Sequence, residues 1–232
     1  MKNWRGYTLL DAILLFSGII SVTIAGAIFK SQWYVIVQSI LIILCVFTQA
    51  KGKISTQFIG VVSFCFYIYI SYIQKYYGES ILYLTIMLPM YIYGIVHWLR
   101  NKDNTNDVVI VKSNLSKIEW IVMSIGFILV STFVYLLLKV LHTEELIIST
   151  LSFVTMLPAV YLLIRRCKWN QVAFLVNDFI VPLLWIMLVI KGDISFISMC
   201  ITYIFQLTYD IYGLIEWIKL EKKQKADGIT EK

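Results

Sequence analysis

Long hydrophobic stretches, separated by polar intervals, occupy most of the chain. Because the hydrocarbon core of a bilayer is about 30 Å thick and a helix rises about 1.5 Å per residue, a spanning helix needs about 20 residues. The pattern therefore predicts an all-α membrane protein with eight transmembrane helices. These helices are expected at about residues 8–29, 32–50, 54–74, 79–99, 118–138, 146–164, 170–190 and 194–218.

One long polar connector, NKDNTNDVVIVKSNLSK at residues 101–117, interrupts this pattern. Most of the other intervals are only a few residues long, so helices that follow one another are expected to be antiparallel neighbours. The connector thus divides the eight predicted helices into two groups of four.

The composition excludes a soluble domain. Hydrophobic residues make up 59% of the chain and charged residues 15%, with a mean hydropathy of +0.79, whereas soluble proteins have roughly 45–50% apolar and about 25% charged residues. Sixteen of the twenty basic residues lie in the intervals on the side of the two termini. The positive-inside rule gives this distribution for a cell-membrane protein with both termini in the cytoplasm. Topology therefore explains the net charge of +6, and no nucleic-acid partner is expected.

The first hydrophobic stretch has a second interpretation. Lys2 and Arg5 precede an apolar run that contains the small residues 25–27, as in a cleaved signal peptide. The run is about 22 residues long, however, and carries Asp11, which a usual signal core does not. We therefore expect a retained helix; cleavage would leave seven spans and an outside N-terminus.

An internal repeat relates the two groups of helices. The sequence IYGIVHW, which ends at Trp98, returns as IYGLIEW, which ends at Trp217, 119 positions later. Both copies end the fourth helix of their group, and parallel repeats of this kind recur in transporters that hold substrate between two halves. Gly94 and Gly213 are expected to allow close helix approach, and the two tryptophans to lie at the cytoplasmic headgroup level. Chance recurrence in aromatic-rich helices is the alternative.

The seventh helix carries the richest set of polar side chains within the membrane. Gln171, Phe174, Asp178 and Trp185 recur at spacings that place them on one helical face, and Asn177 flanks it. A charge at bilayer depth costs several kcal/mol unless it is paired or hydrated, so this face indicates a functional site.

The eighth helix has a matching stripe of Gln206, Asp210, Gly213 and Trp217, with Tyr212 beside it. Aromatic faces stack on flat heterocycles, while amides and carboxylates bind carboxamide and ribose groups. The predicted ligand is therefore a small heterocyclic molecule held near mid-bilayer. Hydrogen bonds that only hold the helices together remain the alternative explanation.

No metal site or cofactor is expected. The four cysteines lack C-x-x-C spacing, and the two histidines, His97 and His142, are far from each other in the sequence.

The paired IYG…W endings, the segment NDFIVPLLW and the four-plus-four layout resemble the PnuC family of nicotinamide riboside transporters. The resemblance implies two parallel three-helix bundles joined by a linking helix, plus one extra N-terminal helix. It also implies facilitated diffusion, without a coupled ion, of a substrate that a kinase then traps, and a homotrimer among membrane lipids. The corresponding boundaries are an additional helix in residues 1–30, a first bundle in 31–100, a connector and linking helix in 101–141, a second bundle in 142–219 and a cytoplasmic tail in 220–232.

The expected substrate contacts combine this resemblance with the polar faces of the helices. Phe174 and Trp185 are expected to sandwich the base, with amide and carboxyl groups on the carboxamide and ribose. The complete candidate set is Asn177, Asp178, Phe174, Trp185, Gln171, Gln57, Asp210 and Tyr212. The chain departs from the family at the Trp-x-x-Trp motif that precedes the asparagine, where it has Gln171 and Phe174.

Other functions stay open at this point. Relatives in the same superfamily carry thiamine, riboflavin or deoxynucleosides, so the missing tryptophans leave the substrate class wider than one compound. Tyr209 and Asp210 resemble half of an intramembrane aspartyl protease motif, but the companion Gly-x-Gly-Asp is missing from the sequence. A receptor or scaffold would explain the helices but not polar groups held at matching depth.

Overall fold

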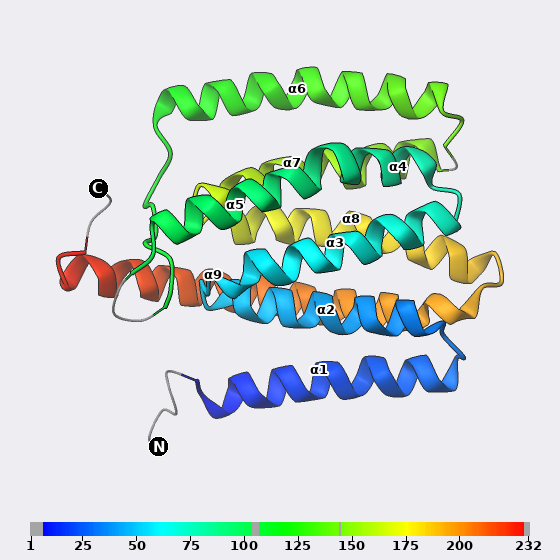
Figure 1. Cartoon of the computed structure of the whole chain (residues 1–232), viewed down its shortest axis with the longest axis horizontal. Coiled ribbons are helices and arrows are strands. Elements are labelled where there is room, and N and C mark those ends of the chain that lie inside the picture. Colours follow the sequence, from blue (N-terminus) through cyan, green and yellow to red (C-terminus); the bar gives the residue numbers. More distant parts are fainter. Residues whose placement is uncertain (1–6, 104–106, 144, 230–232) are drawn as a thin grey trace.

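The computed structural model describes residues 7–103, 107–143 and 145–229, and within them the regular secondary structure is helical (Figure 1). The elements are α1 (Leu9–Ile28), α2 (Trp33–Ala50), α3 (Ser55–Ile73), α4 (Tyr77–Leu82), the π-helical turn η1 (Tyr83–Met87), α5 (Leu88–Arg100), α6 (Lys117–Val140), α7 (Leu146–Ile164), α8 (Asn170–Ile190), the 3-10 turn η2 (Ile194–Phe196) and α9 (Ile197–Ala226). Taking α4–η1–α5 and η2–α9 as continuous, eight of these helices are long and apolar enough to cross a membrane, which confirms the predicted count. The last helix extends beyond the predicted end at residue 218, and a 2.7 Å pair between Glu221 and Lys225 supports its polar final turns.

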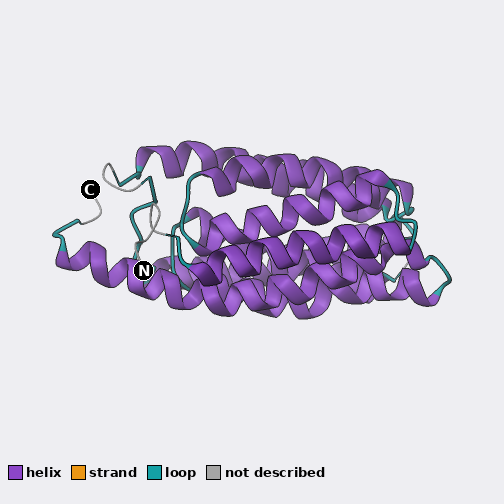
Figure 2. Cartoon of the chain, turned by 90° about the horizontal axis from the view of Figure 1, so that it is seen from below, coloured by secondary structure: helices purple, strands orange, loops and turns teal. Residues whose placement is uncertain are grey.

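The helices lie side by side along one axis, so the molecule has two ends (Figures 1 and 2). The end where α1 begins and α9 finishes is called the terminal end; it also carries the turns at Lys51 and Arg165 and the connector between α5 and α6. The opposite end, with the turns at Lys30, Lys75 and Lys191, is called the distal end. The helices α1 and α6 are outermost, on opposite sides of the bundle.

The two halves pack against each other reciprocally. Helix α2 packs on α3 and α9, and helix α7 packs on α8 and α5. The Trp98 indole N–H donates to the Leu163 carbonyl at the end of α7 (3.0 Å), and the Trp217 indole donates to the Gln49 carbonyl at the end of α2 (2.7 Å). The repeated tryptophans thus make equivalent bonds to opposite halves. Their expected position among lipid headgroups is wrong, because both rings are fully buried and lie 6.1 Å apart.

The repeated glycines also take equivalent positions. A Cβ atom on Gly94 would lie 2.5 Å from the Gln57 side-chain oxygen, and one on Gly213 would lie 2.8 Å from the Gln171 amide carbon. As predicted, each glycine lets a neighbouring helix come close: α3 approaches α5 and α8 approaches α9. The neighbour in each half is a fully buried glutamine.

The outer helices begin in the same way and are anchored in the same way. Thr8 and Asp11 form a capping box at the start of α1, and Ser116 and Glu119 form one at the start of α6. Asp11 then pairs with Lys51, which caps the C-terminus of α2, at 2.9 Å. In the same manner Glu119 pairs with Arg165, the C-cap of α7. The structure therefore places α1 and α6 at corresponding positions. The sequence at the start of α6, around Glu119, is not evidently similar to the sequence at the start of α1.

Candidate functional site

A cavity lies between the two halves near the middle of the helices. Counted as the space open to the centres of water molecules, it measures about 70 Å³, which is room for about five waters. Its polar wall residues are Gln38, Gln49, Ser63, Asn177, Asp178 and Gln206. Its aromatic wall residues are Phe64, Tyr67, Tyr83, Tyr91, Phe174 and Tyr203. The cavity thus combines flat rings with hydrogen-bonding groups, as the sequence predicts for a heterocycle site.

Asn177 is fixed on this wall by helix α7. Its side-chain N–H groups donate to the Ser152 backbone carbonyl at 2.7 Å and to the Thr155 hydroxyl at 2.9 Å. Asn177 is 2% exposed, so water does not compete for these bonds. The amide is therefore held in one orientation before any ligand enters.

Asp178 and Asp210 come together, as their similar depth predicts. One Asp178 carboxylate oxygen accepts a 3.2 Å hydrogen bond from the Gln206 amide, and the other has no hydrogen-bond partner. Asp210 lies beside Asp178, outside the cavity lining, and its Oδ2 is also without a partner. Among the residues that the structure describes, neither aspartate forms an ion pair with lysine or arginine. Two adjacent buried carboxyl groups without a counter-ion favour binding of a proton or a cationic group.

Positions related by the internal repeat carry different side chains on the two sides of the cavity. The Ser63 hydroxyl donates to the Gln38 amide oxygen (3.3 Å) between α3 and α2, where the second half has Asn177 bonded to Ser152. In the following position of each half, Phe64 meets Tyr91 with ring centroids 4.7 Å apart, whereas Asp178 meets Asp210. At this position the first half therefore contributes aromatic rings and the second half contributes carboxyl groups, whereas amides and other aromatic rings reach the cavity from both halves.

Several predicted residues lie outside this cavity. Trp185 is fully buried behind the wall, stacked on Phe196 at 5.5 Å, with its indole N–H directed to the Tyr203 hydroxyl at 3.3 Å. The expected sandwich of Phe174 and Trp185 is therefore not formed: only Phe174 lines the cavity. Seven residues along a helix keep a side chain on the same face but move it about 10 Å along the axis. That displacement carries Trp185 past the distal end of the cavity.

Three further predicted contact residues, Gln57, Gln171 and Tyr212, lie toward the terminal end. Tyr212 joins an ion cluster, donating to the Asp11 carboxylate at 2.7 Å while the Lys51 ammonium donates to its hydroxyl at 2.6 Å. Gln57 and Gln171 are buried against the repeated glycines and are not part of the cavity wall.

Three tyrosines of the first half that were not among the predicted contacts also belong to the cavity wall. Tyr67, Tyr83 and Tyr91 are buried and line the cavity, although aromatic residues of this region are more often packing residues. The spacing of Tyr83 and Tyr91, eight residues apart on one helical face, was the available signal.

Gly60 holds the aromatic wall in place. A Cβ atom on Gly60 would lie 2.2 Å from the Tyr91 ring, which is buried and packed edge-on against Phe64. Gly60→Ala is therefore expected to push the Tyr91 ring into the cavity and to weaken ligand binding about threefold, and the overpacking is expected to lower the free energy of unfolding by about 1–3 kcal/mol. Isothermal titration of the purified variant measures this change. Gly126→Ala, at a position with open space around it, is the matched control; equal affinity of the two variants would contradict the prediction.

A family model described as "Nicotinamide mononucleotide transporter" matches residues 32–219. The chain is 28% identical over 226 residues to the nicotinamide riboside transporter PnuC of Neisseria mucosa, covering 95% of this chain and 85% of that protein. It is 32% identical over 75 residues to the PnuC of Haemophilus influenzae, covering 32% of this chain and 33% of that protein. The crystal structure of the vitamin B3 transporter PnuC aligns with a TM-score of 0.82 and 25% identity over 94% of each chain.

Proposed function

Because the chain belongs to the nicotinamide mononucleotide transporter family, we propose that it carries nicotinamide riboside across the cell membrane by facilitated diffusion. The observation that carries this proposal is the cavity between the halves, in which four aromatic rings of the first half lie with the Asn177 amide and the Asp178 carboxyl group of the second half. Nicotinamide riboside joins a flat, positively charged pyridinium ring to a polar ribose, so its two parts match the aromatic rings and the polar groups of the cavity.

The predicted contacts take different roles in this proposal. Phe174 stacks on the pyridinium ring, Asn177 bonds the carboxamide or ribose, and Asp178 faces the positive charge. Asp210 supports Asp178 from behind the wall. Gln57 and Gln171 line the route from the cavity to the terminal end, while Trp185 and Tyr212 hold the structure around the site without touching the ligand in this state.

The proposed orientation follows the basic residues, sixteen of twenty of which are on the side of the termini, so the terminal end faces the cytoplasm. The cavity of about 70 Å³ is too small for a nucleoside, and helices must part to admit one. Rocking of the bundle in residues 31–100 against the bundle in 142–219 would open each end in turn. The buried pair of Trp98 and Trp217 closes the terminal end in this state. The homotrimer is also part of the proposal, and the mass of the solubilised protein tests it.

Transport in proteoliposomes tests the proposed function. Labelled nicotinamide riboside is expected to enter until the inside and outside concentrations are equal, without ATP or an ion gradient, and a proton ionophore is expected to leave the rate unchanged. Uptake no faster than in protein-free liposomes would contradict transport. Competition by thiamine, riboflavin and deoxynucleosides measures the alternative substrates, and a product of altered mass would favour an intramembrane enzyme that uses the Asp178–Asp210 pair.

A further inference from the structure

A further buried carboxylate, separate from the Asp178–Asp210 pair, lies beyond the cavity on its distal side. Glu79 is in α4 and is fully buried. One of its carboxylate oxygens accepts a 2.7 Å hydrogen bond from the Ser152 hydroxyl, and the other, Oε2, makes no hydrogen bond. The Tyr67 hydroxyl faces this carboxylate but has no hydrogen bond of normal geometry either. A polar atom without a partner at a fully buried position indicates a place for a ligand.

Glu79 belongs to the same inward-facing stripe as the cavity wall. Glu79, Tyr83, Met87 and Tyr91 follow one another at intervals of four through α4, η1 and α5, and all four are buried. Tyr83 and Tyr91 line the cavity. One further turn moves the carboxylate about 6 Å from Tyr83 toward the distal end. The π-helical turn within this stripe is a feature that occurs frequently at functional sites.

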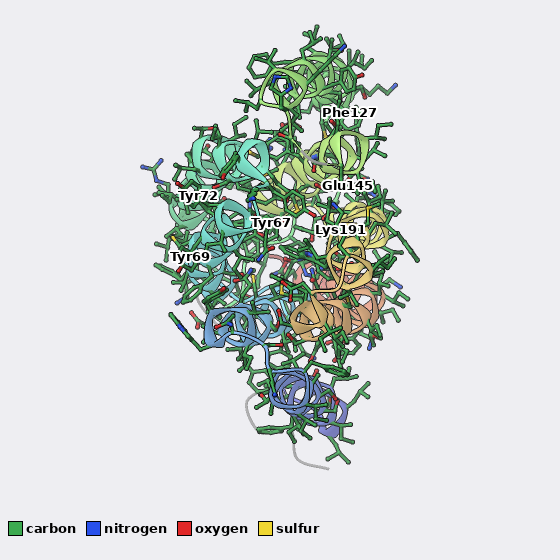
Figure 3. All side chains as sticks on the ribbon, turned by 90° about the vertical axis from the view of Figure 1, so that its right-hand side faces the viewer. Tyr67, Tyr69, Tyr72, Phe127, Glu145 and Lys191 are labelled. Atoms are coloured by element: carbon green, nitrogen blue, oxygen red, sulfur yellow. The ribbon has the colours of Figure 1, made fainter. Side chains whose placement is uncertain are left out.

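Aromatic rings separate Glu79 from the cavity. The rings of Tyr67 and Tyr83 lie 4.5 Å apart, and Tyr67 also packs edge-on against Trp185 at 5.7 Å. Seen from the distal end, Tyr67 lies in the middle of the helices, whereas Tyr69 and Tyr72 of the same helix lie at the outside (Figure 3). Tyr67 and Tyr83 thus form a floor between the cavity and the carboxylate.

No fixed positive charge compensates this carboxylate: within the described part of the chain, neither lysine nor arginine forms an ion pair with Glu79. An uncompensated charge in a dry membrane interior is costly, whereas a carboxylate beside aromatic faces suits an organic cation that can come and go.

Ser152 connects this place to the cavity. Its hydroxyl donates to Glu79, and its backbone carbonyl accepts the 2.7 Å hydrogen bond from Asn177. A ligand that binds the Glu79 carboxylate can therefore shift Ser152, the residue that orients the Asn177 amide.

We propose that Glu79, together with the rings of Tyr67 and Tyr83, is a second binding station for a flat organic monocation, on the route between the distal face and the cavity. This inference rests on the proposed transport function and extends it to the route that the substrate takes. In this proposal the ligand's positively charged ring leaves Glu79 when the side chains of Tyr67 and Tyr83 move apart. The ligand then enters the cavity and approaches Asp178.

The test compares two ligands of nearly the same shape and different charge. These are nicotinamide riboside and its 1,4-dihydro form, whose ring is neutral, and the quantity measured is the ratio of their affinities for the full-length protein. Glu79→Gln keeps the size of the side chain and an oxygen that accepts from Ser152, but removes the charge. It is expected to reduce the preference for the cation about fivefold, the scale of a desolvated cation–π and charge contact. Asp193→Asn, which removes an exposed distal carboxylate, is expected to leave the ratio unchanged.

An unchanged ratio in folded Glu79→Gln, or equal weakening of both ligands, would overturn the inference. If this variant does not fold, Glu79→Asp keeps the charge but draws the carboxylate back from the Tyr67 and Tyr83 rings; it is expected to lower the ratio about threefold, and an unchanged ratio again overturns the inference. Wild-type protein that binds neither riboside would contradict the proposed function instead. In that case the ratio of affinities is measured for the pyridinium cation 1-methylnicotinamide and neutral nicotinamide. Glu79→Gln is expected to reduce this ratio by the same factor.

Discussion

Replacing Lys51 by methionine is expected to lower the free energy of unfolding by about 3–5 kcal/mol, the usual cost of removing one partner from a buried ion pair. The Lys51 ammonium lies 2.9 Å from Asp11 and 2.9 Å from Glu216, and it donates to the Tyr212 hydroxyl at 2.6 Å. Methionine fills a similar volume but leaves Asp11, which is 1% exposed, without its positive partner. Because this cluster joins α1 to α9 and to the end of α2, its loss should also loosen α1.

The stabilisation contributed by Lys51 is expected to persist across the ordinary pH range. Burial alone would lower the pKa of Lys51, but hydrogen bonds to Tyr212, Asp11 and Glu216 outweigh it and raise the pKa above its usual value. A raised pKa in the folded state means that the stabilisation is fully present below the unfolded-state pKa of about 10.4 and is lost only at higher pH. The wild-type protein should therefore keep this stabilisation from neutral pH to about pH 10.

Unfolding in detergent with increasing denaturant measures the change in free energy. Lys139→Met removes an exposed lysine from the last turn of α6 and is expected to change stability by less than about 0.5 kcal/mol. Adding Asp11→Asn to Lys51→Met should restore part of the loss, because the amide carries no buried charge. A loss below about 1 kcal/mol in Lys51→Met would mean that water or lipid headgroups already compensate Asp11.

Asn177→Ala and Asp178→Ala are each expected to weaken binding of nicotinamide riboside more than about tenfold, the scale of a lost buried hydrogen bond to a charged group. The two residues are adjacent in sequence but act differently. The Asn177 amide is held by Ser152 and Thr155, so it meets the ligand without losing conformational entropy. Asp178 has a carboxylate oxygen without a partner, which the positive ring can take.

Equilibrium binding to the purified protein measures both variants, with size-exclusion chromatography as the check of folding. Ser124→Ala, on the exposed face of α6, is the matched control and is expected to bind as the wild type does. Unfolding or aggregation of the two alanine variants would instead mean that Asn177 and Asp178 only hold α7, α8 and α9 together.

Most of the helical organisation could be predicted from the sequence, since lipid imposes a simple rule. A segment that crosses the hydrocarbon core must bond its own backbone and carry apolar side chains for about 20 residues. Periodicity also placed Phe174 and Asp178 on one helical face, and the structure puts both on the cavity wall.

Periodicity could not predict how far along the helix axis the cavity extends, or which helix packs opposite a given side chain. Trp185 shares the face of Asp178 but lies beyond the cavity, and Tyr212 follows Asp210 by only two residues yet bonds to Asp11 at the start of the first helix. Neither outcome can be obtained from one helix alone, because each depends on which element packs opposite.

By itself, the sequence determined that eight helices are long and apolar enough to cross a membrane and that α8 and α9 carry polar groups at similar depth, and it indicated a repeat between the two groups of helices. These properties are local, because they follow from the solvent and from the spacing within one helix. Only the tertiary structure decided that α1 and α6 are anchored alike, that Tyr67 and Tyr83 separate Glu79 from the cavity, and that aromatic rings of both halves meet the Asp178 carboxyl group in one cavity. The physical reason is that these features are contacts between residues far apart in the chain, and their distances exist only once the helices have packed.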